Sequence, residues 1–208
     1  MTTSDSTAHR ARVVALAPGL QELPEPLVVG CSGGADSLAL VALLSYRNIP
    51  ALVVYVDHGL RSESADDADI VRAAASDCEM PVRVVTVDVA RGANLEARAR
   101  DARYLALRTC AADVGASGIA VAHTGDDQAE TVVLNLLRGA ALAGLSGIAP
   151  VRNDIYRPLL GVRRADTEAV CAEMGWQPVV DPTNADPVFL RNRIRHEVLP
   201  LLSEAARR

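Results

Sequence analysis

A glycine-rich loop between an apolar strand and a helical run holds residues suited to binding a phosphate chain. Residues 28–37 read Val-Val-Gly-Cys-Ser-Gly-Gly-Ala-Asp-Ser, and the candidate binding residues are Ser32, Gly33, Gly34, Asp36 and Ser37. The two glycines permit positive φ angles and close approach to the backbone, so N–H groups can converge on an anion at the helix N-terminus. The serines add hydroxyl donors, and Asp36 offers a carboxylate to a magnesium ion.

Neither common phosphate motif accounts for this loop. It lacks the Lys-Ser/Thr ending of a Walker A sequence and the spaced glycines of a dinucleotide-binding turn. An ordinary glycine turn before a helix capped by Asp36 or Ser37 is the structural alternative. We favour phosphate binding because an apolar strand precedes the loop and a helical run follows it.

A second candidate site is the acidic segment at residues 123–131, His-Thr-Gly-Asp-Asp-Gln-Ala-Glu-Thr. Thr124 or Asp126 can cap a helix there, which places Asp127 and Glu130 on one face. Two carboxylates suit a second magnesium ion or an ammonium-bearing substrate, and one of them can accept a proton from an attacking amine. The alternative is that acidic residues simply favour a helix N-terminus.

Asp57 and His58 follow an apolar strand and are candidates for contacts to an adenine or a ribose. A hydrogen-bonded turn explains the same pair equally well.

Two basic segments are candidates for binding phosphate or RNA. At helical spacing Arg100, Arg103 and Tyr104 form one stripe, which suits a phosphate or an RNA backbone. A solvated helix face with ion pairs is the alternative reading of that stripe. Arg191 and Arg195 are four residues apart on one helix face, a spacing suited to clamping a phosphate.

Alternating apolar runs and helical stretches position these residues. The expected strands are 27–31, 52–56, 82–87 and 119–122, and the expected helices are 37–46, 63–77, 95–114, 126–137, 164–174 and a last one from 190. With a short extended piece around Tyr156, the pattern predicts an α/β fold with a doubly wound, Rossmann-like parallel sheet of about five strands. Because ligands bind beyond the carboxyl ends of such strands, three of the polar segments should converge.

Composition limits the class of protein. The chain has 208 residues, of which 50% are hydrophobic and 3% aromatic, so one globular unit with an aliphatic core is expected. A net charge of −5 gives no overall basic field, and all 21 basic residues are arginine. The four cysteines form no C-x-x-C pair and are interpreted as buried thiols in the cytoplasm. No segment has the composition of a signal peptide or a membrane span.

Several sequence blocks together resemble the bacterial tRNA(Ile)-lysidine synthase family of the PP-loop ATP pyrophosphatase superfamily. The matching blocks are 32–37 (SGGADS), 56–61 (VDHGLR), 94–104, 122–139 (AHTGDDQAETVVLNLLRG), 144–148, 157–160 (RPLL) and 181–202 (DPTNADPVFLRNRIRHEVLPLL). The resemblance departs from the family pattern at Thr124, where the family often carries a second histidine.

The resemblance implies an adenine nucleotide alpha hydrolase-like PP-loop fold and an enzyme that joins lysine to carbon 2 of the wobble cytidine of tRNA(Ile) with a CAU anticodon. The reaction would use ATP and Mg²⁺, pass through an adenylated cytidine, and release AMP and pyrophosphate. Residues assigned to ATP by the resemblance are Ser32, Gly33, Gly34, Asp36 and Ser37. Those assigned to lysine binding and catalysis are Asp126, Asp127 and Glu130, and those assigned to phosphate or tRNA are Arg191, Arg193 and Arg195.

The same resemblance suggests a flexible tail at residues 1–12 and a single catalytic domain at 13–208, whose last helix leads to a linker or further domain. A homodimer stays open. A PP-loop tRNA thiolase is the nearest alternative, but such enzymes generally need paired or catalytic cysteines, and near the loop the sequence places only Cys31. A small amidating ligase would not explain block 181–202. A non-catalytic ATP-binding module would bind ATP and magnesium without releasing pyrophosphate.

Overall fold

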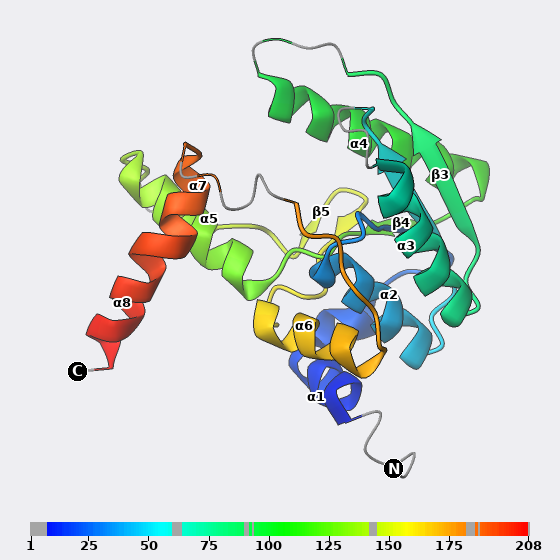
Figure 1. The fold of residues 1–208 in the computed structure, drawn as a ribbon, viewed down its shortest axis with the longest axis horizontal. Coiled ribbons are helices and arrows are strands. Elements are labelled where there is room, and N and C mark those ends of the chain that lie inside the picture. Colours follow the sequence, from blue (N-terminus) through cyan, green and yellow to red (C-terminus); the bar gives the residue numbers. More distant parts are fainter. Residues whose placement is uncertain are drawn as a thin grey trace.

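In a computed structural model, which describes residues 8–59, 64–89, 92, 94–141, 145–181, 186 and 188–207, a six-stranded sheet forms the centre of the protein (Figure 1). The strands are β1 (Leu27–Gly30), β2 (Ala51–Asp57), β3 (Val82–Thr86), β4 (Gly118–Ala120), β5 (Val151–Arg152) and β6 (Ile155–Tyr156). Their order is β3-β2-β1-β4-β6-β5, and neighbours are parallel except for β5 and β6. The order reverses beside β1, where an open sheet offers its ligand site.

The predicted doubly wound α/β fold is confirmed, although the described residues form six strands instead of about five. The difference arises from the extended piece around Tyr156, which is an antiparallel hairpin of β5 and β6. Asn153 makes its turn with a φ of 56°, a conformation that asparagine tolerates better than most residues. β6 then pairs with β4 and continues the parallel sheet.

The predicted helices are confirmed, with ends shifted by one or two residues. They are α2 (Ala35–Tyr46), α3 (Ser64–Asp77), α4 (Leu95–Asp113), α5 (Gly125–Leu137), α6 (Arg164–Glu173), α7 (Leu190–Arg193) and α8 (Leu199–Ala206). Two elements that were not predicted precede them, α1 (Ala8–Leu16) and a 3-10 turn at Pro18–Glu22. The last helix is interrupted by a π-helical turn at Ile194–Val198, just before Pro200, which has no N–H to donate.

Helices cover both faces of the sheet. Successive residues of a strand point to opposite faces. Accordingly Val29 of β1 packs in a core with α1, α2, α3 and α6, whereas Val28 packs against Leu107 of α4 on the other face. α2 lies between the sheet and α6, so its apolar residues 38–44 are buried on all sides. This buried helix fixes the glycine-rich loop between β1 and α2.

The N-terminal segment corrects one prediction, because part of the expected flexible tail at residues 1–12 is helical. α1 begins at Ala8 and is tied to α6 by charged contacts. The backbone N–H of His9 donates to the Glu173 carboxylate at 2.8 Å, and Arg12 pairs with Asp166 at 2.9 Å. Residues 1–7 lie outside the described residues.

α5 exposes part of its apolar surface. Leu136 and Leu137 near its end are 59% and 58% exposed. The helix follows β4 and contacts α7 and the π turn after it, and α5, α7 and α8 project together from one side of the molecule (Figure 1). Among the helices that are described, none is both long enough and apolar enough to span a membrane.

Candidate active site

The glycine-rich loop is held in shape by hydrogen bonds of its own. Ser37 Oγ donates to the Gly34 carbonyl at 2.9 Å and accepts from the Ser32 N–H at 3.1 Å. Gly34 precedes the first turn of α2 in an extended conformation, and Gly33 has a φ of +82°. The loop therefore presents backbone at the N-terminus of a buried helix, the arrangement expected for an anion site.

The segment that follows α6 lies against this loop. The Val179 N–H donates to the Gly33 carbonyl at 2.9 Å. A Cβ built on Gly33 would lie 2.7 Å from Val179 Cγ2. Gly33 thus meets two demands that only glycine satisfies, a positive φ and a close approach of the backbone to its neighbour.

Replacing Gly33 by alanine is expected to lower the free energy of unfolding by about 1–3 kcal/mol, because the substitution combines backbone strain with the contact to Val179. Gly139→Ala is the matched control, since Gly139 has a φ of +75° but no atom within 4 Å of an added Cβ. Urea unfolding of both variants measures the difference. Equal losses would show that the contact to Val179 has no effect.

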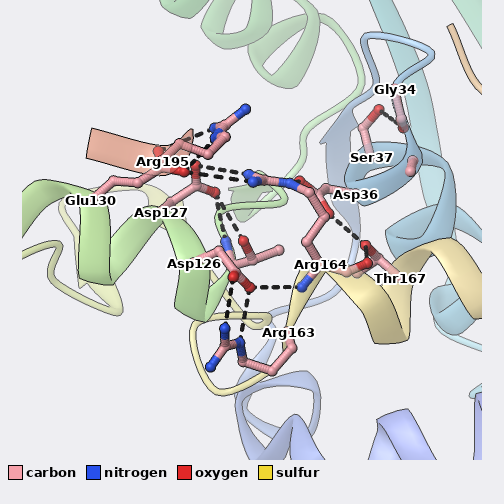
Figure 2. A network of polar contacts seen from close by, with 12 residues as sticks. Gly34, Asp36, Ser37, Asp126, Asp127, Glu130, Arg163, Arg164, Thr167 and Arg195 are labelled. Carbon is pink, nitrogen blue, oxygen red and sulfur yellow. Dashed lines mark hydrogen bonds and ion pairs between the residues drawn. The ribbon is translucent and has the colours of Figure 1, made fainter. Parts of the chain in front are cut away.

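Asp36 faces α6 from the first turn of α2. Thr167 Oγ1 donates to Asp36 Oδ1 at 2.5 Å, and Arg164 Nε lies 3.4 Å from Asp36 Oδ2 (Figure 2). Burial raises the pKa of Asp36 above its usual value, although the contacts of Thr167 and Arg164 act in the opposite direction. The charge of Asp36 is therefore only partly compensated by its neighbours, and a further cation beside it would stabilise the ionised form.

Asp127 and Glu130 share one face of α5, as predicted. Asp127 Oδ2 accepts from the backbone N–H of Thr124 at 2.9 Å, while Asp127 Oδ1 accepts from Arg191 at 3.0 Å. Glu130 is fully buried and accepts from Arg191 Nε at 2.7 Å and from Arg195 Nε at 2.6 Å. Burial alone would raise the pKa of Glu130, but the bonds from Arg195 and Arg191 outweigh it and hold the pKa below its usual value.

These contacts change the interpretation of the basic cluster formed by Arg191, Arg193 and Arg195, which was assigned to phosphate or tRNA. Arg191 and Arg195 do share one helix face, as predicted, but in this structure both guanidiniums bind Glu130. Arg193 points elsewhere and pairs with Glu197 at 3.4 Å, where both side chains are more than half exposed. The predicted set of three arginines is therefore divided, with Arg193 apart from the carboxylates.

Arg164, at the start of α6, joins the two predicted sites and was missed by sequence reasoning. Its guanidinium lies 3.4 Å from Asp36, 3.5 Å from Asp127 and 3.5 Å from Glu130 (Figure 2). A signal was present in the sequence, because two adjacent arginines at the N-terminus of a helix oppose the helix dipole, which favours acidic neighbours there. That partner set is the carboxylates of α2 and α5.

Asp126 is engaged by α6. Its carboxylate accepts two bonds from Arg163, at 2.9 and 3.1 Å, and one from the backbone N–H of Arg164 at 2.8 Å. Asp126 thus anchors the first turn of α6 to α5, and these contacts keep its pKa low against the effect of burial. The geometry supports a positioning role for this residue.

Asp57 and His58 form a separate group with the α4 stripe. Asp57 Oδ1 accepts from the Gly59 N–H at 2.8 Å, as in the alternative of a hydrogen-bonded turn. His58 Nε2 lies 3.5 Å from Arg103, and the Arg100 guanidinium lies 5.6 Å from the centre of the Tyr104 ring. The stripe on α4 therefore continues onto the end of β2.

His123, just before α5, has a buried Nδ1 without a hydrogen-bond partner in the structure. Burial lowers the pKa of His123 to about 4; Asp127 raises it, and the charges of Arg157, Arg100 and Arg191 lower it further. The imidazole is accordingly neutral at physiological pH and can accept a hydrogen bond.

The lowered pKa of His123 predicts a loss of stability in mild acid. The unfolded chain protonates this histidine near its usual pKa of 6.5, whereas the folded protein does so only near 4. Stability is therefore expected to fall between those two pH values, by up to about 1.4 kcal/mol per pH unit. Urea unfolding between pH 7 and 4.5 measures this slope, which should be smaller in His123→Gln. An identical slope in the variant would contradict the assignment.

Two cysteines lie beside the loop, which corrects the prediction that only Cys31 does. Cys31 Sγ is 3.6 Å from Ser37 Oγ, and Cys171 Sγ of α6 is 3.4 Å from the Ala35 carbonyl. All four cysteines are unpaired and buried, as the sequence predicted. Burial raises the pKa of Cys31, and it raises that of Cys171 to about 12, so both are thiols at neutral pH.

No group of three or more histidine, cysteine or carboxylate side chains among the described residues is arranged to hold a metal ion. Magnesium, however, commonly binds through one or two carboxylates together with substrate phosphates. Asp36, half-buried and beside the predicted phosphate loop, fits that second arrangement.

Comparisons of the sequence place the chain among known proteins. Residues 8–202 match the PP-loop domain family. The chain is 47% identical over 204 residues to a tRNA(Ile)-lysidine synthase of Salinispora tropica and 44% identical over 205 residues to one of Thermus thermophilus. The alignments cover 92% and 96% of this chain but 61% and 39% of those relatives. The chain thus spans about three fifths of the length of the first and two fifths of the second.

Solved structures share the fold at low sequence identity. The U34-tRNA thiolase NcsA from Methanococcus maripaludis superimposes with a TM-score of 0.71 at 16% identity, covering 93% of this chain and 74% of that chain. An NMN synthetase from Francisella tularensis reaches 0.57 at 12% identity, covering 83% and 71%. Because these proteins have different activities, the fold alone does not select a reaction.

Proposed function

Because this chain belongs to the PP-loop domain family, we propose that it is an ATP-dependent ligase that joins lysine to carbon 2 of the wobble cytidine in tRNA(Ile) with a CAU anticodon. The observation that carries the proposal is the position of Arg164, which contacts Asp36 of the loop and both Asp127 and Glu130 of α5. A phosphate site and an amine site would then be adjacent, as a ligation through an adenylate requires.

The first step of the proposed reaction activates the cytidine. The oxygen on carbon 2 attacks the α-phosphorus of ATP, the bond to the β,γ-phosphates breaks, and pyrophosphate leaves into the loop formed by residues 32–37. Backbone N–H groups and the hydroxyls of Ser32 and Ser37 would hold the departing charge. Asp36 would hold Mg²⁺, which supplies neutralisation of phosphate charge when it is bound.

The second step forms the new bond. The ε-amine of lysine attacks carbon 2, and AMP leaves with the oxygen that was activated. The amine must first lose a proton, and we assign Asp127 as the acceptor, because its side chain is 13% exposed, whereas Glu130 is fully buried beneath two arginines. Glu130 would instead position Arg191 and Arg195 at the site.

RNA binding is proposed for the stripe of Arg100 and Arg103 on α4, with Asp57 and His58 nearer the nucleotide. Asp57 ends β2, and Arg103 lies 3.5 Å from His58, so the stripe reaches the carboxyl end of β2, where the site of an open α/β sheet is expected. With tRNA and free lysine as substrates, the cytoplasm is the proposed location.

Thiolation of tRNA is the competing reaction within this fold. It needs a reactive thiolate or a cluster ligand, yet the two cysteines beside the loop are buried and have raised pKa values. Their chemistry favours ligation over sulfur transfer.

Transfer of labelled lysine tests the proposal. The chain is incubated with ATP, magnesium, labelled lysine and an unmodified tRNA(Ile) bearing CAU, with tRNA(Met) as control. Label on tRNA(Ile) alone is the expected result. Pyrophosphate release without lysine incorporation would indicate another acceptor, and ATP binding without pyrophosphate release would favour a non-catalytic module.

A further inference from the structure

We propose that Arg164 is a phosphate-binding residue, which leaves the carboxylates when the nucleotide binds and contacts the β,γ-phosphates and the pyrophosphate leaving group. This inference rests on the proposed function, since it names a further residue of the same site. The guanidinium is the cation that reaches the loop from α6 (Figure 2).

The loop itself lacks the charge that a polyphosphate needs. Residues 28–37 contain no cationic side chain, and the chain has no lysine to act as in a Walker A motif. In the part of the chain that the structure describes, Asp36 pairs with one arginine, Arg164. A phosphate chain bound beside Asp36 would therefore find this guanidinium within reach of a small side-chain movement.

The contacts of Arg164 are those of a loosely held side chain. Its three distances to carboxylate oxygens are 3.4, 3.5 and 3.5 Å, whereas Arg191 and Arg195 approach Glu130 to 2.7 and 2.6 Å. The side chain is 25% exposed. Arginine recognises phosphate oxygens with a planar fork, which these long contacts leave available.

Departure of Arg164 leaves no carboxylate without a partner. Asp36 keeps the hydroxyl of Thr167, Asp127 keeps Thr124 and Arg191, and Glu130 keeps two arginines. These partners of Asp127 and Glu130 lie at the start of α5 and on the last helical segments, not on α6. Exchange of carboxylate for phosphate at Arg164 is thus local and needs no rearrangement of the fold.

Binding of inorganic pyrophosphate with magnesium, measured by calorimetry on the whole chain, tests the inference, with AMP as the ligand that lacks the β,γ-phosphates. Arg164→Gln is expected to lower pyrophosphate affinity by about tenfold to a hundredfold. AMP affinity should stay within about twofold, because the substitution removes no proposed contact to AMP. Arg12→Ala is the control, since Arg12 contacts α6 at Asp166 and is 66% exposed.

Unchanged pyrophosphate affinity in Arg164→Gln would overturn the inference. So would an equal loss of AMP affinity in that variant, or an equal loss of pyrophosphate affinity in Arg12→Ala. A native chain that binds no pyrophosphate would overturn it as well. If Arg164→Gln does not fold, Arg164→Lys decides, because it retains the charge but loses the fork. An approximately threefold to tenfold weaker pyrophosphate affinity with AMP unchanged is then expected, and unchanged affinity for both contradicts it. Because neither lysine nor RNA is present, a failure of lysine transfer with these results intact would concern the proposed function alone.

Discussion

Glu130→Gln is expected to lower the free energy of unfolding by about 3 kcal/mol and to abolish lysine transfer. Glu130 is fully buried and faces three guanidiniums, those of Arg164, Arg191 and Arg195. A neutral amide would leave positive charges close together without the carboxylate that neutralises them. The π turn that carries Arg195 would then lose its main attachment to α5.

The effect of Glu130→Gln should depend on pH in a defined direction. The arginines hold the pKa of Glu130 below its usual 4.5, so its contribution to stability is present above that pH and is lost as pH falls through the lower folded value. Native protein and variant should therefore differ most above pH 5 and converge in stronger acid. Guanidinium-induced unfolding at pH 7 and pH 3 measures both differences.

Arg193→Ala serves as the control for this variant, because Arg193 lies in the same helical segment but pairs with exposed Glu197. A surface pair of this kind contributes about 0–1 kcal/mol. If Glu130→Gln were no less stable than Arg193→Ala, the carboxylate would not hold the arginines as we describe.

The sheet and its helices were predictable because their signals are local. Apolar runs of strand length and helical spacing can be recognised without knowledge of distant residues. The glycines between them likewise predicted a turn at the start of a helix. The strand count was less accurate, since the β5–β6 hairpin consists of two-residue strands that have no periodicity to read. α1 was missed because its attachment depends on Glu173 and Asp166, which are far away in sequence.

The carboxylates of the candidate site were predictable from the sequence, but the arginines that pair with them were not. Sequence spacing placed Asp127 and Glu130 on one face, and Arg191 with Arg195 on another. It could not show that these faces meet, because the contact joins residues 61 to 65 positions apart. For the same reason Arg164 escaped notice, since its three carboxylate partners come from two other helices.

Asp36→Asn should reduce pyrophosphate release about a thousandfold while changing the free energy of unfolding by less than about 1 kcal/mol. Asp36 and Glu130 differ in the direction of their pKa shifts. Burial raises the pKa of Asp36, so the folded protein binds a proton there more readily than the unfolded chain does. The ionised form therefore costs stability above the raised pKa, and this cost disappears as pH falls toward 3.8.

An asparagine relieves that cost and still accepts the hydrogen bond of Thr167, which explains the small effect on stability. It cannot neutralise a metal ion, which explains the large effect on the reaction. Pyrophosphate release in the presence of tRNA(Ile), followed alongside urea unfolding at pH 7, separates the two quantities. A variant that releases pyrophosphate at the native rate would remove Asp36 from the proposed metal site, and one that is several kcal/mol less stable would show that its charge supports the fold.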